Sequence, residues 1–260
     1  QALVNRMGFN NEGSEQLSIN LAQHFAKYGA PKVPLWVNLG KSKITPLDEA
    51  HEDYGATMRA LWDYTDVFVV NVSSPNTPNL RELQNDEGLM RILESCHNVN
   101  QDLAPAGTEK PILVKVAPDL TDQQLEHVVI TARSSGAAGI VLSNTTLVRP
   151  EGKTAKEDSI FAETGGLSGR PLLNRSTEMI RIVSKMTKGE WPIVGVGGVM
   201  SADDAWEKIR AGASLVQAYS GFVFEGPSLT KSVVHGIHKH LVLQEFSTVN
   251  EAVGSGTRSL

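Results

Sequence analysis

The stretch DVFVVNVSSPNTPN, residues Asp66–Asn79, begins as a buried β-strand and ends in a run of small polar residues and prolines. Its first part is almost continuously apolar, which is typical of a parallel strand buried on both faces of a sheet. A simple turn needs only one or two small polar residues, whereas seven consecutive residues here are polar or proline. The stretch therefore favours a buried parallel strand, and the polar run at its end is longer than a simple turn requires.

Five more apolar runs of similar length occur along the chain, separated by segments with helical periodicity. Together the six runs cover residues 33–40, 66–73, 111–118, 138–145, 191–198 and 213–220. The segments between them carry helix start signals, among them Thr45, Thr121 and Ser201 as N-cap residues. Because strand and helix alternate along the chain, the sequence predicts parallel βα units and an α/β fold.

Polar side chains or glycine pairs follow the carboxyl end of every predicted strand. They are Asn38; Asn71 with Ser73 and Ser74; Lys115; Asn144 with Thr145; Gly197 with Gly198; and Tyr219 with Ser220. In α/β barrels the active site lies at this end of the strands. Turns favour asparagine, serine and glycine in any case, but an unpaired lysine such as Lys115 is costly to bury in a strand. The pattern therefore predicts an active site at the carboxyl ends of the strands.

The last two strand ends are rich in glycine, which exposes backbone N–H groups suited to an anion. Barrels often bind a phosphate group after their seventh and eighth strands. The run Gly195–Met200, GVGGVM, lacks the third glycine of a dinucleotide fingerprint. The predicted ligand is therefore a phosphate-bearing molecule that is smaller than a dinucleotide.

A closed barrel of this kind needs eight strands, whereas six runs are present. If the glycine-rich ends belong to the last two strands, the first two are missing. Since the chain begins with Gln1, we expect residues 1–260 to form a single α/β-barrel catalytic domain with about six of the eight βα units of a TIM barrel.

Composition excludes several other classes of protein. The net charge of −5 provides no basic field for nucleic acid. The single cysteine, Cys96, cannot form an internal disulfide. No apolar run approaches the roughly 18 residues of a membrane-spanning helix. His235 and His238 lack partners at metal-ligand spacing, so we expect a solvated helix face there and no metal site.

Several motifs resemble those of a known family in their amino-acid sequence and in their order along the chain. They include NRMGFN (5–10), VNLGKS (37–42), VNVSSPNTPNLR (70–81), LVKVAPDLT (113–121), ETGGLSGRPL (163–172) and KIRAGASLVQAYS (208–220). The chain resembles class 2 dihydroorotate dehydrogenases, which are quinone-dependent and membrane-associated. The resemblance implies an FMN-binding (β/α)8 barrel that oxidises dihydroorotate to orotate, with reoxidation by a quinone, in pyrimidine biosynthesis.

The resemblance also implies roles for individual residues. Ser74 corresponds to the catalytic base that removes a proton from substrate C5 while a hydride leaves C6 for FMN. The residues implied to bind substrate are Asn5, Phe9, Asn71, Asn76, Asn144 and Thr145. The residues implied to bind FMN are Asn38, Asn71, Lys115, Ser143, Ser168, Gly169, Gly197, Gly198, Tyr219 and Ser220. The segment Leu147–Arg170 is long for a βα connection, and we expect a loop that covers the substrate.

The expected partners follow from the same family. Class 2 enzymes carry a small helical domain ahead of the barrel that forms the quinone tunnel and meets the membrane, and we expect that domain to lie outside residues 1–260. We expect a monomer that reaches the membrane through this domain. The location would be the mitochondrial inner membrane in a eukaryote and the cytoplasmic face of the inner membrane in a bacterium.

From the residues alone, two alternatives stay open. One is a phosphate-binding barrel of another type, such as an isomerase or aldolase, in which Lys115 would be the reactive group. The other is a truncated, non-catalytic chain, for which the missing strands are the evidence. A bound flavin would distinguish the dehydrogenase from both alternatives.

Overall fold

A computed structural model describes residues 1–257, and its centre is a six-stranded parallel sheet in the order β2-β3-β4-β5-β7-β8. The strands are β2 (Trp36–Leu39), β3 (Val67–Asn71), β4 (Ile112–Val116), β5 (Gly139–Leu142), β7 (Ile193–Val196) and β8 (Leu215–Gln217). Each strand lies within one of the six apolar runs, so all six predicted strands are confirmed. The strands are shorter than the runs because the polar ends of the runs form loops.

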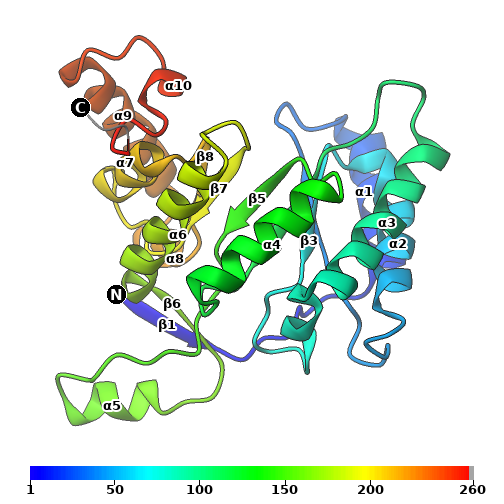
Figure 1. Cartoon of the computed structure of the whole chain (residues 1–260), viewed down its shortest axis with the longest axis horizontal. Coiled ribbons are helices and arrows are strands. Elements are labelled where there is room, and N and C mark those ends of the chain that lie inside the picture. Colours follow the sequence, from blue (N-terminus) through cyan, green and yellow to red (C-terminus); the bar gives the residue numbers. More distant parts are fainter. Residues whose placement is uncertain (258–260) are drawn as a thin grey trace.

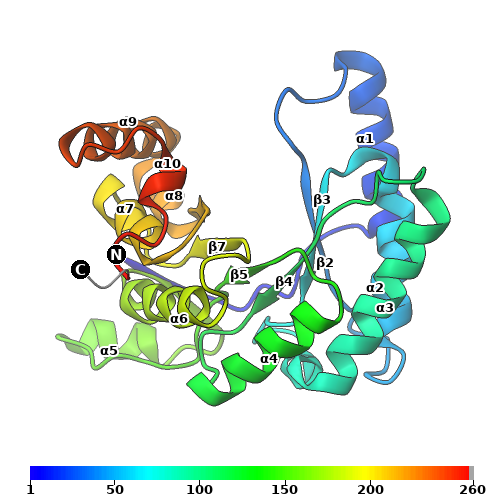
Figure 2. The ribbon, with the colours of Figure 1, turned by 45° about the horizontal axis from the view of Figure 1, so that its top comes forward.

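Neighbours in the sheet are also consecutive strands of the parallel set, as expected for repeated βα units. The sheet is curled (Figures 1 and 2), and β2 and β8 do not pair with each other. The predicted α/β class is therefore confirmed as a partial barrel whose two outer strands are open edges.

Helices cover the convex face of the sheet, as Figure 2 shows for α2, α3, α4 and α6. The helices are α1 (Ser14–Tyr28), α2 (Ala50–Leu61), α3 (Asp86–Leu103), α4 (Asp122–Ser134), α5 (Ala155–Phe161), α6 (Leu173–Met186), α7 (Ala202–Ala211), α8 (Ser220–Glu225), α9 (Ser228–Leu243) and α10 (Val249–Ala252). Short 3-10 helices are η1 (Trp62–Tyr64), η2 (Leu80–Gln84) and η3 (Arg170–Leu172).

Two of the three predicted helix caps are confirmed. Thr121 and Ser201 accept hydrogen bonds from the first turns of α4 and α7. The prediction for Thr45 is wrong, because α2 begins at Ala50 and has no side-chain cap. The carbonyl of Thr45 instead accepts a hydrogen bond of 2.7 Å from Lys41 Nζ, which holds this segment outside the helix.

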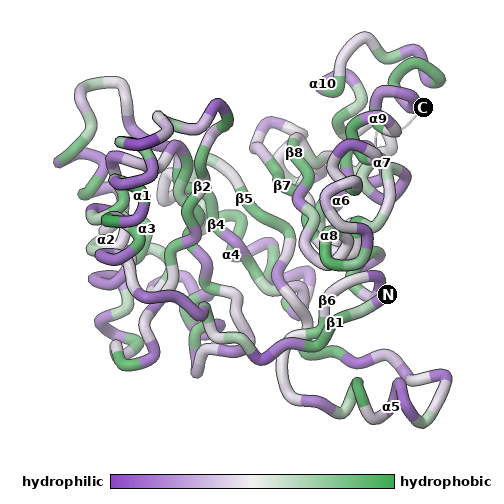
Figure 3. The backbone as a smooth tube through the Cα atoms, turned by 180° about the vertical axis from the view of Figure 1, so that it is seen from behind, coloured by the Kyte–Doolittle hydropathy of each residue, from purple (hydrophilic) through white to green (hydrophobic). Residues whose placement is uncertain are grey.

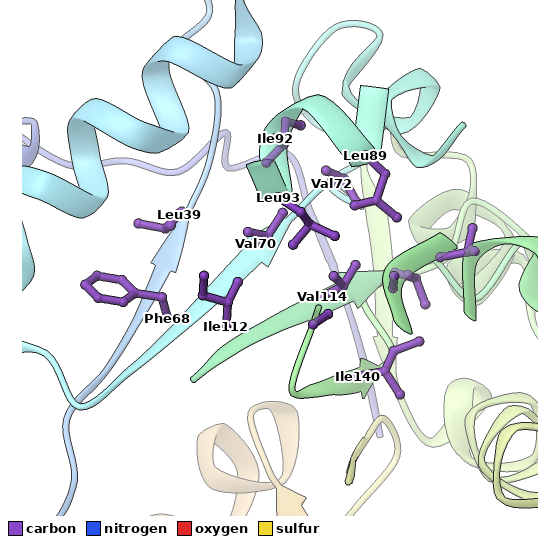
Figure 4. Close-up of a cluster of buried hydrophobic side chains, with 14 of the residues drawn as sticks. Leu39, Phe68, Val70, Val72, Leu89, Ile92, Leu93, Ile112, Val114 and Ile140 are labelled. Carbon is purple, nitrogen blue, oxygen red and sulfur yellow. The ribbon is translucent and has the colours of Figure 1, made fainter. Parts of the chain in front are cut away.

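The main hydrophobic core lies between the sheet and its helices. Phe68, Val70 and Val114 are fully buried on this face, where Val70 lies beside Leu93 of α3 (Figure 4) and the Phe68 ring stacks on Trp62. A smaller cluster, formed by Val69, Leu113, Val141 and Val194, occupies the concave face. Both faces of the central strands are thus apolar, which explains the continuous apolar runs (Figure 3) and leaves the strand ends as the place for polar groups.

One pair of strands was not predicted. β1 (Ala2–Asn5) pairs antiparallel with β6 (Gly166–Gly169), outside the main sheet. The predicted lid, Leu147–Arg170, is therefore not a plain loop, because it contains α5 and β6 and projects from the body at α5 (Figure 1). The sequence GLSG has low strand propensity, and its partner lies far away in the chain, so no local pattern indicated the pairing.

Candidate functional site

The Ser74 loop continues β3 and is held by its own side chains. Ser73 Oγ donates to Asn71 Oδ1 at 2.7 Å, and Asn76 N donates to Ser74 Oγ at 3.2 Å. Ser74 is only 5% exposed. From the far side, the buried Tyr54 hydroxyl donates to Asn71 O at 2.9 Å. The loop is therefore ordered by hydrogen bonds, and the Ser74 hydroxyl has a fixed environment.

The ends of β3 and β5 are tied together by Asn144. Its Nδ2 atom donates to Ser73 Oγ at 2.8 Å and to Asn71 Oδ1 at 3.4 Å. Its Oδ1 atom accepts from Thr145 N at 2.7 Å. The amides of Asn71 and Asn144 thus form one network, in which each asparagine can donate and accept.

The segment after β1 reaches the same loop. Asn76 Nδ2 donates to Asn5 O and Asn5 Oδ1, both at 3.2 Å, and to Met7 O at 3.1 Å. The ring of Phe9 packs against Gly40, where an added Cβ would come within 3.4 Å of it. The structure thus brings five of the predicted substrate residues to the Ser74 loop in two hydrogen-bonded groups, Asn5 with Asn76 and Asn71 with Asn144 and Thr145. Phe9 lies beside Gly40, in the loop that follows β2.

Lys115 stands next to this cluster, since its Cα pairs with that of Asn71 in the sheet register. It lies on β4 with the same orientation as Leu113, toward the concave face. Among residues 1–257, no hydrogen bond or ion pair to the side chain of Lys115 is formed, and burial lowers its pKa. An unpaired cation in such a position is costly, so an anionic or electron-rich group is its natural partner.

The predicted phosphate end lies at β6 and β8. Ser168 Oγ and Ser220 Oγ are 2.8 Å apart and share a hydrogen bond, and both residues are buried. Gly169, Gly197 and Gly198 all have positive φ angles. Asn38 and Tyr219 lie at the open edge strands, are exposed, and make no side-chain hydrogen bond within residues 1–257. Ser143 is buried, and its N–H donates to Val196 O.

Gly198 requires glycine for two reasons. Its φ is +75°, and an added Cβ would lie 2.7 Å from the backbone N and Cα of Leu173. We expect Gly198→Ala to destabilise the protein by roughly 3 kcal/mol and to weaken binding of a phosphate-bearing ligand. Gly189→Ala is the matched control, because Gly189 has a φ of +73° with nothing within 4 Å. Urea unfolding of both variants tests this, and equal losses of stability would contradict it.

Lys208 on α7 is a second buried lysine, behind the glycine pair. Its Nζ atom donates to Ser176 Oγ at 2.7 Å and to Thr177 Oγ1 at 3.1 Å, and Ser176 Oγ in turn donates to Gly197 O at 3.1 Å. Burial lowers the pKa of Lys208 to about 7, although Asp204 opposes the shift. Lys208 is therefore linked through Ser176 to Gly197, at the predicted phosphate end.

This pKa predicts how stability depends on pH. Between pH 7 and about 10 the unfolded chain binds more protons at Lys208 than the folded chain, so the free energy of unfolding rises with pH. This pH-dependent contribution to the free energy of unfolding, on the order of 4 kcal/mol, is absent in Lys208→Met. In urea unfolding, the free energy of unfolding of the wild-type protein should therefore rise relative to that of Lys208→Met from pH 7 to pH 10. The same pH dependence of the free energy of unfolding in both proteins would contradict this. Lys185→Met, which replaces an exposed lysine, serves as control.

Sequence reasoning missed two features of the site. Ser73 was noted at the end of its strand but was not assigned a role, whereas it is fully buried and joins Asn71 to Asn144. Thr77 is 3% exposed, and its hydroxyl has no hydrogen-bond partner. A buried hydroxyl without a partner, in the loop that carries Ser74, is available to a ligand or water. Its position in the SSPNT motif was the signal that could have identified it.

The described residues contain no group of three or more His, Cys, Asp or Glu side chains placed to hold a metal ion. The side chains of this site are hydroxyls, amides and one lysine. Such groups bind and orient an organic ligand by hydrogen bonds and charge.

Comparison with known proteins identifies similar chains. A sequence model of the family "Dihydroorotate dehydrogenase" matches residues 1–241. A dihydroorotate dehydrogenase (quinone) of Nostoc punctiforme is 44% identical over 263 residues, which cover 100% of this chain and 68% of that protein. A protein of the same name from a Cyanothece species is 46% identical over 93% of this chain and 64% of its own length. The chain thus spans about two thirds of the length of these relatives.

Solved structures agree with these matches. The crystal structure of DHODH from Eimeria tenella in complex with ferulenol superposes with a TM-score of 0.90 at 31% sequence identity. The superposition covers 99% of this chain and 72% of that one. The ligand-free structure of the same protein gives the same TM-score over 75% of its chain.

Proposed function

Because the chain belongs to the dihydroorotate dehydrogenase family, we propose that it carries the catalytic site of a quinone-dependent enzyme that oxidises dihydroorotate to orotate. The single observation that supports this most strongly is the arrangement at the end of β3 and β4. There the buried Ser74 accepts a hydrogen bond from Asn76 N, and it follows Asn71, whose Cα pairs with that of Lys115. This arrangement supplies a proton acceptor, amide clamps and a cation at neighbouring positions.

Membership in this family implies a flavin cofactor, and we propose that it is FMN. When bound, the flavin supplies the acceptor for the hydride that leaves substrate C6. The residues present fit this group: Lys115 is a partly buried cation whose side chain has no partner within residues 1–257, and the Ser168–Ser220 pair offers hydroxyls at the glycine-rich end. Lys115 would stabilise negative charge on the ring, while the serines and glycines would hold the phosphate group.

Ser74 would act as the base that accepts the proton from C5. A serine hydroxyl has a high pKa, so it acts as a base only if its own proton leaves through a relay and the developing negative charge is stabilised. The Asn76 N–H already donates to Ser74 Oγ and would favour negative charge there. Thr77, whose hydroxyl is buried without a partner, offers a further proton carrier in the same loop.

The asparagine network would bind the substrate. A pyrimidine ring with its carboxylate presents both donors and acceptors, and a carboxamide side chain matches both. Asn76 is fixed by three bonds to the segment after β1, and Asn144 by bonds to Asn71 and Ser73. Because these side chains are already oriented, substrate binding would cost little additional ordering.

The final electron acceptor and the location of the protein in the cell are part of the same proposal. The named relatives are quinone-dependent, so we propose a quinone as the final acceptor and association with a membrane surface, as a monomer. No helix in residues 1–257 is long and apolar enough to cross a membrane. That the barrel has two further strands, and that a helical domain precedes it, stay predictions.

Turnover with different electron acceptors tests this function. The purified protein is given dihydroorotate with a soluble quinone, or with NAD⁺, and orotate formation is followed. The proposal predicts orotate with the quinone, little with NAD⁺, and FMN when the released flavin is identified by mass. Release of FAD would overturn the FMN assignment, and turnover with NAD⁺ alone would overturn the quinone assignment.

A further inference from the structure

Arg81, on η2 just after the Ser74 loop, contacts three separate loops at once. Its Nε atom donates to Ser73 O at 3.0 Å, and its Nη2 atom donates to Thr145 O at 3.0 Å. Its Nη1 atom forms an ion pair of 2.6 Å with Asp119 Oδ2. One planar guanidinium therefore connects the loops that follow β3, β4 and β5.

Asp119 extends this connection to the beginning of the segment that precedes α5. Its Oδ1 atom accepts from the hydroxyl of Thr146, and its Oδ2 atom accepts from Leu147 N at 3.2 Å. The side chains of Arg81 and Asp119 are 21% and 20% exposed. Because the pair is largely shielded from water and hydrogen-bonded on both sides, it is stronger than an exposed ion pair.

The two carbonyl partners of Arg81 lie at the sites of the proposed chemistry. Ser73 directly precedes the proposed base, Ser74, and Thr145 is one of the residues proposed to bind substrate. We propose that Arg81, held by Asp119, is a positioning residue that sets the placement of Ser74 relative to the substrate. This inference rests on the function proposed above, because the placement matters only if Ser74 and Thr145 act on one substrate.

The geometry requires arginine specifically. Three donors in a rigid plane reach two carbonyls and one carboxylate in three directions. Lysine is a point charge on a flexible stem, so Arg81→Lys would keep the charge but lose at least one of the carbonyl bonds. Arg81→Gln would lose the charge and most of the donors.

The first test is a double-mutant comparison in the flavin-loaded protein that carries this chain. A displacement of about 1 Å can cost about 100-fold in rate, so Arg81→Gln should slow flavin reduction by dihydroorotate by roughly 10- to 100-fold, with flavin content retained. Arg81→Lys should be intermediate. In a Ser74→Ala background, adding Arg81→Gln should cost less than about 3-fold more, because the base it positions is gone. Equal losses in both backgrounds would overturn the inference.

The second test needs no turnover. Arg81→Gln should increase amide hydrogen exchange at Asn76 and Leu147 together, by about tenfold, because both loops lose their shared anchor. Arg59→Gln is the control, since it breaks an Arg–Asp pair with Asp102 between α2 and α3. Unchanged exchange at either amide in Arg81→Gln would overturn the inference. A wild-type protein that binds flavin but does not react with dihydroorotate would instead contradict the proposed function, and exchange would still decide whether Arg81 anchors both loops.

Discussion

Replacing Ser74 by alanine is expected to slow flavin reduction by dihydroorotate by about 10²- to 10⁴-fold, the usual contribution of a general base. The buried Ser74 hydroxyl is the proposed acceptor of the substrate proton, and Asn76 N already donates to it. Flavin binding should not change, because Ser74 is not among the residues predicted to hold the cofactor. Anaerobic stopped-flow absorbance measures the rate directly.

The fold should tolerate this replacement. Only the hydrogen bond from Asn76 N is lost, which costs about 1 kcal/mol. Ser184→Ala is the matched control, because Ser184 is also buried but lies on α6. If Ser74→Ala reduces flavin as fast as Ser184→Ala does, Ser74 is not the base.

Lys115→Met is expected to have the second largest effect. Methionine keeps an unbranched apolar stem but removes the charge, so negative charge on the reduced flavin loses its stabilising cation. The removal of one such electrostatic group slows reactions by about 10²- to 10³-fold, and the flavin should become harder to reduce and bind more weakly. Flavin content, its reduction potential and the rate of reduction by dihydroorotate measure the three consequences.

A lysine that precedes the same strand provides a control for this replacement. Lys110 lies just before β4, at its opposite end, where its ammonium group packs over the Trp62 ring. Burial lowers the pKa of Lys110 as well as that of Lys115. Lys110→Met should keep flavin content and potential. If both variants shift the potential equally, or neither does, Lys115 has no specific role at the flavin.

The sheet and the position of the site could be predicted because both follow from local pattern. A parallel strand buried on both faces must be apolar along its length, so a polar residue at its carboxyl end is conspicuous. Lys115 shows this most clearly, as a charge inside LVKVAP that turned out to lack a protein partner in the described part of the chain. Ser74, Asn71 and Asn144 were found in the same way; Asn71 and Asn144 form one network through Ser73, and Ser74 follows Ser73 in the same loop.

The features that could not be predicted depend on tertiary contacts. β1 and β6 are short and far apart in the chain, and only their pairing makes them strands. Lys208 belongs to an ordinary helix sequence, and nothing local shows that it is completely buried. Arg81 and Asp119 are 38 residues apart in two different loops, so their ion pair follows from the fold alone.

The most direct test of the central claim is one anaerobic absorbance measurement. Dihydroorotate is added to the purified, flavin-loaded protein that carries this chain, with no other electron acceptor present. We expect the flavin absorbance to bleach, with one orotate formed for each flavin reduced. A protein that binds flavin but keeps its colour in the presence of dihydroorotate would contradict the proposed function.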